Sequence, residues 1–161
     1  MANDTTRVAR LDYVRAFIQA ATSVIAQVVG EEPTVGTPVF QIGPMVNLGD
    51  VNVSLGITGD IPGQVNYGMA MQTSLNIASA MLMETVEAHD EMSISALQEL
   101  GNMISGNART YLAELQLFSD ITPPKTVVGK DISANWHRTR AMSIPLTLSY
   151  GTLMLVVGIR Q

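Results

Sequence analysis

Glu99 and Asn102 are the residues of this chain whose types and spacing best suggest chemistry. They lie in a segment, 93–118, whose apolar residues recur at helical spacing. On a helix that advances about 100° per residue, one side collects the apolar stripe Leu97, Ile104, Ala108, Tyr111 and Leu115, and the opposite side collects Ser95, Glu99, Asn102 and Gly106. Three positions apart, Glu99 and Asn102 stand side by side, roughly 4.5 Å along the axis. The spacing predicts a carboxylate and an amide presented together on an exposed helix face.

Two glycines in the same helix need an explanation. Gly101 and Gly106 each cost on the order of 1 kcal/mol relative to alanine inside a helix. Close approach of another surface would justify them, and that surface is either a strand or helix of the same protein or a docking partner. Taken alone, an exposed Glu and Asn on such a helix are most simply solvated side chains.

The elements before this helix are read from changes of period. An apolar stripe at three- and four-residue steps predicts a helix over 11–28, which Gly30 and the Glu31-Glu32-Pro33 segment end. Two-residue alternation then predicts strands at 51–57 and 65–71, joined as a hairpin by the turn 59–63, with a shorter strand near 38–41. A second helix is expected from an N-cap at Thr73 or Ser74.

The rest of the chain completes an α+β pattern. An acidic link, 84–91, precedes the helix over 93–118, which Thr122-Pro123-Pro124 separates from strands at 126–129, 142–150 and 152–159. Pro145 indicates an edge position or a bulge in its strand. We expect one domain, 1–161, with 1–9 as a flexible N-terminus, in which about three helices pack on a mixed or antiparallel sheet of about six strands.

Composition excludes several classes of function. With 9 Lys+Arg against 14 Asp+Glu, the net charge of −5 argues against nucleic-acid binding, which needs clustered cations. The absence of cysteine excludes a disulfide scaffold, a thiol nucleophile and a cysteine zinc site, and two histidines make a His-rich metal centre improbable. No apolar run long enough to span a membrane and no signal-peptide core occur, so we expect a cytoplasmic protein.

Three other segments carry weaker signals. His89, among acidic residues, suggests a metal ligand but is more often only solvated. The turn 59–63 is rich in glycine but lacks a lysine and a following helix, so a hairpin turn is favoured over a phosphate cradle. The segment 136–140, with the densest group of cations, is either a partner-docking patch or a loop that leads into a strand.

In order and spacing, these motifs resemble a known family. Ser95-x-x-x-Glu99-x-x-Asn102, followed after 21 residues by Pro124, is similar to the signature of the CheC/CheX/FliY chemotaxis phosphatases. The likeness extends from the opening helix through the turn at 56–60 and the segment 99–107 to Thr122-Pro123-Pro124 and Val127-Val128-Gly129. The stretch between Asn102 and Pro124 is about one residue shorter than is usual in the family. A single Glu-x-x-Asn helix is found here, as in CheX-like members, whereas CheC-like members have two.

The resemblance implies a mechanism. Family members hydrolyse the aspartyl phosphate of a CheY-like response regulator, which itself supplies the bound Mg²⁺ and a lysine, so no cofactor of the chain's own is expected. Asn102 would orient the attacking water and Glu99 would pair with the regulator's lysine. The small residues Gly101, Gly106, Ser95 and Ser105 would leave room for that partner. The resemblance also implies a homodimer formed through sheet edges, and the alternating C-terminal strands are suitable edges for it.

Two other functions remain open at this point. One is a non-catalytic module of a chemotaxis, flagellar or other signalling complex that binds a response regulator without hydrolysing it. The other is a small-molecule hydrolase, which is disfavoured because the sequence offers no nucleophile–base arrangement.

Overall fold

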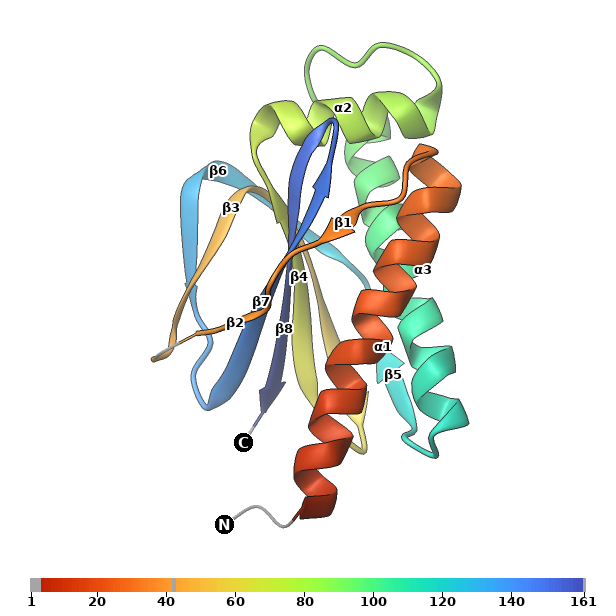
Figure 1. Cartoon of the computed structure of the whole chain (residues 1–161). Helices are drawn as coiled ribbons and strands as arrows, with labels where there is room; N and C mark the ends of the chain where they lie inside the picture. The colour runs from red at the N-terminus through yellow and green to blue at the C-terminus, as the bar shows by residue number, and fades with distance from the viewer. Residues whose placement is uncertain (1–3, 42, 161) are drawn as a thin grey trace.

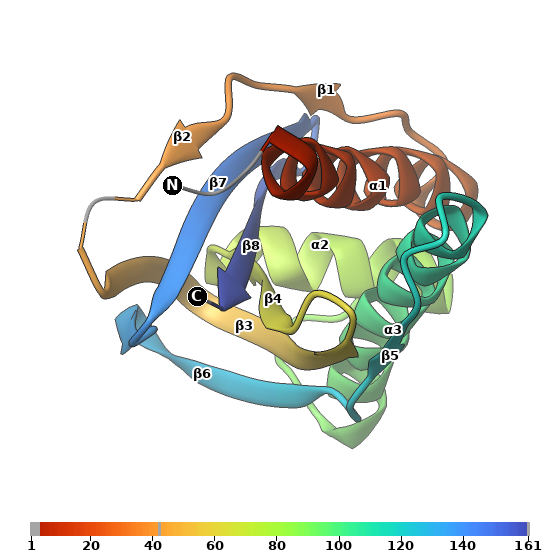
Figure 2. The ribbon, with the colours of Figure 1, turned by 90° about the horizontal axis from the view of Figure 1, so that it is seen from below.

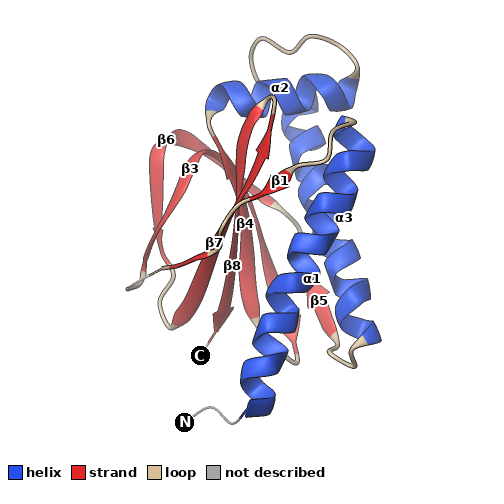
Figure 3. Cartoon of the chain, in the orientation of Figure 1, coloured by secondary structure: helices blue, strands red, loops and turns tan. Residues whose placement is uncertain are grey.

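The structure, a computed structural model, describes residues 4–41 and 43–160, with side chains from residue 10 onward except Ile42. Three helices lie on one side of a strongly curved sheet (Figures 1 and 3). The elements in chain order are α1 (Asp4–Val29), β1 (Thr34–Val35), β2 (Val39–Phe40), β3 (Met45–Gly59), β4 (Gly63–Met69), α2 (Met71–Leu82), α3 (Glu91–Glu114), β5 (Ser119–Ile121), β6 (Lys125–Asn135), β7 (Thr139–Leu148) and β8 (Gly151–Arg160).

The sheet has the order β1-β7-β8-β4-β3-β5, with β2 also paired to β7 and β6 also paired to β3. Every strand pair within the described residues is antiparallel, so the antiparallel form of the predicted α+β fold is confirmed. The predicted hairpin is β3–β4, in which Ile57 pairs with Gly63. None of the described helices is both long enough and apolar enough to cross a membrane.

The main core lies between the helices and the sheet. Strand alternation places Val53, Leu55 and Tyr67 on the face under α3, and all three are buried. On the α1 side, this core contains Tyr13 and Phe17, whose ring centroids lie 5.4 Å apart. Leu11, predicted on the apolar stripe of this helix, is instead exposed at the rim of the core.

The other face of the sheet carries a smaller core, because β6 and the loop after it curl over that face (Figure 2). Trp136 packs there with Val46, Ala141 and Val156. Of the two interpretations of 136–140, a loop that leads into a strand is therefore the correct one for Trp136, because its indole is buried and not presented to a partner. Strand β7 begins at Thr139.

The helix boundaries differ from the predictions in three places. Helix α1 begins at Asp4, so residues 4–9 continue the helix where a flexible segment was expected; no Gly or Pro in this stretch interrupts it. Helix α2 begins at Met71, and its N-cap is Ala70, whereas Thr73 or Ser74 was predicted. Ser74 lies inside the first turn, where its hydroxyl donates to the Met71 carbonyl.

Helix α3 is the third difference, since it ends at Glu114 and not at Phe118. Gln116 turns the chain with a φ of 63°, and Leu117 N then donates to the Leu112 carbonyl. The turn leaves Leu115 exposed, although it was predicted in the buried stripe, and it frees 119–121 to form β5 on β3.

Pro145 lies on a nearly open edge, as predicted. On that side β7 pairs only with the two-residue strands β1 and β2, and Pro145 falls in the gap between them. Its carbonyl accepts from Gly36 N at 2.8 Å, and its missing N–H leaves no donor unsatisfied there.

Candidate functional site

Helix α3 packs closely on the sheet at Gly101, between Glu99 and Asn102. A Cβ at this position would lie 3.0 Å from Val53 Cγ1 and 3.4 Å from Tyr67 Cδ2. The absence of a side chain therefore lets the helix lie directly on β3 and β4. Two explanations were offered for a glycine in this helix, and packing within the protein is the one that accounts for Gly101.

A buried hydrogen bond also holds α3 against the sheet, on the side of the helix that carries Gly101. The Tyr67 hydroxyl lies 2.8 Å from Ser105 Oγ, and both residues are buried. The prediction that Ser105 leaves room for a partner is therefore wrong, because its side chain faces the sheet. Burial raises the pKa of Tyr67, so the phenol stays protonated and keeps a donor for this bond. Because Ser105 is three residues after Asn102, the bond sets the rotation of the turn that carries the amide.

The outward side of α3 carries the predicted residues. Ser95 and Glu99 are exposed, and Asn102 and Gly106 are half-buried. Within the described residues no hydrogen bond or ion pair engages the side chain of Glu99 or of Asn102. A Cβ on Gly106 would meet nothing within 4 Å, so this glycine faces open space. The structure thus brings the four predicted residues together on one uncovered helix face.

Two side chains anchor the flank of α3 that faces β5 and β6. Gln98 Nε2 donates to Thr126 Oγ1 at 2.8 Å, and Arg109 Nε donates to the Ser119 carbonyl at 2.8 Å. Thr126 is the second residue after Pro124, so the proline of the predicted signature directly precedes the strand that α3 is tied to. Sequence reasoning missed Gln98, although its position one turn before Asn102 was a signal.

The N-terminus of α3 is capped tightly. The Asp90 carboxylate accepts from Ser93 N at 2.8 Å, and Ser93 Oγ accepts from Asp90 N at 2.8 Å, which completes a capping box. These hydrogen bonds hold the pKa of Asp90 below its usual range. The cap stabilises the first turn of α3, which directly precedes Ser95.

His89 is bound by protein groups and is not merely solvated. Its Nε2 lies 2.7 Å from Ser74 Oγ in α2, and its Nδ1 lies 3.0 Å from Ser93 Oγ in α3. Partial burial lowers the pKa of this imidazole. No group of three or more His, Asp or Glu in the described part of the chain is arranged to hold a metal ion.

The turn at 59–63 is the predicted hairpin. Gly59 adopts a φ of 112°, and a Cβ there would lie 2.5 Å from the Phe118 carbonyl oxygen. Asp60 Oδ2 accepts from Phe118 N at 2.8 Å, so the turn is occupied by the chain that enters β5.

Comparison with solved structures defines the class of fold. A CheX chemotaxis protein from Desulfovibrio desulfuricans superposes with a TM-score of 0.84 at 24% identity, over 92% of this chain and 99% of that one. The chain matched in a CheX–CheY–BeF₃–Mg²⁺ complex from Borrelia burgdorferi gives a TM-score of 0.76 at 28% identity, over 92% of this chain and 98% of that one. The fold is that of the CheC-like chemotaxis proteins.

Sequence comparison is more specific. The family model for chemotaxis phosphatase CheX matches residues 51–147, which include α3 and its flanking strands. The CheY-P phosphatase CheX of Thermotoga maritima is 38% identical over 121 residues, 74% of this chain and 77% of that protein. The chain belongs to the CheX family of chemotaxis phosphatases. Both the predicted family and the predicted enzyme class, a phosphatase, are thereby confirmed.

Proposed function

We propose that this protein hydrolyses the aspartyl phosphate of a CheY-like response regulator, and that the outer face of α3 carries out the reaction. The observation that carries the proposal is the pair Glu99 and Asn102, whose side chains form no hydrogen bond or ion pair within the described residues. The helix that carries them packs on the sheet through Gly101 and is bound to Tyr67 through Ser105. Membership of the CheX family and the likeness to the CheX–CheY complex support a regulator as the substrate.

Asn102 is proposed to position the attacking water. An amide offers both a donor and an acceptor, so it can hold a water in line with the phosphorus without changing its own protonation state. Phosphoryl transfer gains mainly from such positioning and from charge neutralisation. A half-buried amide on an anchored turn loses little freedom when it enters a partner's site.

Glu99 is proposed to pair with the regulator's lysine. The exposed carboxylate stands one helical turn from Asn102, so a charge-assisted contact at Glu99 sets where Asn102 enters the regulator. Ser95 and Gly106 are proposed to line the docking face on either side of this pair. The protein needs no metal of its own in this scheme, because Mg²⁺ bound to the regulator neutralises charge on the phosphoryl group.

The test is phosphate release from acetyl-phosphate-charged CheY-like regulators of the source organism, with and without this protein. Acceleration above the regulator's own rate supports the proposal. Binding of the charged regulator without acceleration would favour a docking module instead. No response to any regulator would contradict a regulator substrate altogether.

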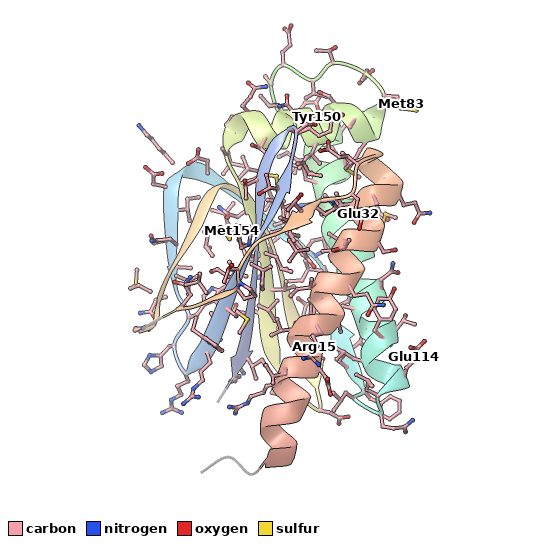
Figure 4. The ribbon with its side chains drawn as sticks, viewed as in Figure 1. Arg15, Glu32, Met83, Glu114, Tyr150 and Met154 are labelled. Atoms are coloured by element: carbon pink, nitrogen blue, oxygen red, sulfur yellow. The ribbon has the colours of Figure 1, made fainter. Side chains whose placement is uncertain are left out.

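Glu99→Ala separates docking from chemistry. We expect the affinity for the charged regulator to fall by about tenfold, because one charge-assisted contact is lost. Glu114→Ala is the matched control, since Glu114 is an exposed carboxylate at the far end of the same helix (Figure 4). Affinities from titration calorimetry that fall equally in the two variants would show that Glu99 makes no specific contact.

We further propose that the protein forms a homodimer through a sheet edge, and we place this edge at β6. The C-terminal strands do not offer the expected edge, because β8 lies between β7 and β4, and β7 pairs with β1 and β2 on its other side. Within the described residues β6 pairs with β3 alone, over eight registered positions interrupted by bulges, so its outer edge is unpaired. Val127 and Val128 are both exposed on this strand. Unpaired backbone groups beside exposed valines are a template for pairing with a second copy.

A further inference from the structure

A groove lies at the end of the molecule where α1 begins and β8 ends, between the helix and the sheet. Its volume is about 520 Å³. Figure 2 views this end directly, with the first turns of α1 beside β7 and β8. Because no lining residue belongs to α3, the groove is separate from the proposed phosphatase face.

The groove has a buried apolar floor and an exposed apolar rim. Met142, Val157 and Ile159 of the sheet form the floor, and each is buried. Leu11 of α1 and Phe40 of β2 form the rim, and the Phe40 side chain is 68% exposed. A phenyl ring this exposed beside a concave apolar floor favours an apolar ligand that covers both.

The charge of the lining is entirely positive. Arg10 and Arg140 are the ionisable residues that line the groove. No carboxylate within the described residues forms an ion pair with either, since the ion pairs there belong to Arg15 and Arg109. In a chain with a net charge of −5, two guanidinium groups at one groove that have no ion-pair partner among the described side chains are complementary to an anion.

We propose that this groove binds a single-chain amphiphile with a carboxylate head group, of the size of a medium-chain fatty acid. The chain would lie on the floor between Leu11 and Phe40, and the carboxylate would contact Arg10 and Arg140. The volume falls within the roughly 300–1,000 Å³ typical of small-molecule sites. A protein partner fits less well, because a stable interface needs about 800 Å² from each side. Only Leu11 and Phe40 are exposed among the apolar lining residues.

The experiment is calorimetric titration of the full chain with decanoate below its micellar concentration, and with the uncharged decanol as the matched ligand. We expect saturable binding of decanoate with one site per chain, and binding of decanol weaker by about tenfold or more, because the charge-assisted contacts are lost. Equal affinity for the two ligands would overturn the assignment of Arg10 and Arg140, and no binding of decanoate would overturn the site.

Two variants locate the site. Arg140→Met keeps the apolar stem and should weaken decanoate binding about tenfold without changing decanol binding. Arg138→Met is the control, because Arg138 is exposed two residues away and does not line the groove. An unchanged thermal midpoint shows that each variant folds. Equal losses in both variants would contradict the proposal.

A third variant, Phe40→Ala, tests for a second copy of the chain in the groove. Self-association that this variant abolishes, together with no binding of decanoate, would show that a second copy occupies the groove instead.

Discussion

At the scale of single residues, Gly101 and Gly106 show that two glycines in one helix can be required for different reasons. Gly101 faces the sheet, where a methyl group would lie 3.0 Å from Val53 Cγ1 and 3.4 Å from Tyr67 Cδ2, so these side chains would have to shift. Gly106 faces open space, where a methyl group would contact nothing within 4 Å. Packing within the chain explains the first, and the proposed docking of a regulator explains the second.

The two glycines therefore make a paired prediction. Gly106→Ala should stabilise the protein by about 0.5–1 kcal/mol, because alanine is the better helix former. It should also weaken regulator binding about tenfold, because the methyl group crowds the docking face. Gly101→Ala should destabilise the protein by about 1 kcal/mol, since overpacking exceeds the gain in helix propensity. Urea unfolding and calorimetry check both.

A Gly106→Ala variant that is more stable and binds the regulator as well as the parent protein would show that no partner approaches this face closely. A Gly101→Ala variant of unchanged or raised stability would show that Val53 and Tyr67 can move away from the helix.

At the scale of elements, the long periodic segments and the short strand near 38–41 could be predicted from sequence, whereas the short strands β1 and β5 could not. The alternation of Val51–Ile57 and the apolar stripe through Leu97 and Ile104 identified β3 and α3, because each pattern spans several turns or residue pairs. Strand β5 has three residues and pairs only with the end of β3, so no periodicity marks it. Its existence depends on a tertiary contact and on the turn at Gln116.

In the candidate site, too, some residues could be predicted from sequence and others could not. Ser95, Glu99, Asn102 and Gly106 could be placed on one face because they belong to one helix, where spacing alone determines direction. The supports behind that face come from other elements. The bonds of Tyr67 to Ser105 and of Gln98 to Thr126 join residues 38 and 28 positions apart, which no local pattern reveals.

Also at the element scale, His89 couples α2 to the N-terminus of α3 in a pH-dependent manner. Its pKa in the folded protein is lowered below 6.5, chiefly by burial, so the unfolded chain binds the proton more readily. Stability should therefore fall as the pH decreases through the unfolded pKa to the folded one. Urea unfolding between about pH 8 and about pH 5 measures this loss.

The control is His89→Gln, which keeps hydrogen-bonding groups but does not titrate. It should be less sensitive to pH over this window than the parent protein. His137→Gln, at an exposed position, should retain the parent's sensitivity. Parallel pH profiles for His89→Gln and the parent protein would assign the effect to other groups.

At the scale of the whole molecule, the sheet formed by residues 4–41 and 43–160 has one long unpaired edge, at β6, and one edge covered in part by β1 and β2. A protein with Val127→Lys and Val128→Lys should shift towards monomer in sedimentation equilibrium, because charged side chains oppose edge-to-edge pairing. Val35→Lys, an exposed valine on the opposite edge, is the control. Dissociation by Val35→Lys alone would place the interface on the β1 edge instead.

The whole molecule also explains why a phosphatase can be built with so little chemistry of its own. Helices α1 and α2 and the curved sheet bury one face of α3 and leave the other uncovered (Figure 1). In the proposed mechanism the substrate protein supplies the phosphoryl group, the metal ion and the lysine. The fold contributes a stiff helix that carries one amide and one carboxylate into that site.

The measurement that tests this account most directly is the single-turnover decay of phosphorylated regulator at saturating concentrations of Asn102→Ala. We expect the variant to bind the regulator but to lose about a hundredfold or more of the acceleration, because the water is no longer held in line. Asn107→Ala, which removes an exposed amide from another side of the same helix, should retain the full rate. Full acceleration by Asn102→Ala would contradict the account, because the reaction would then take place elsewhere on the protein.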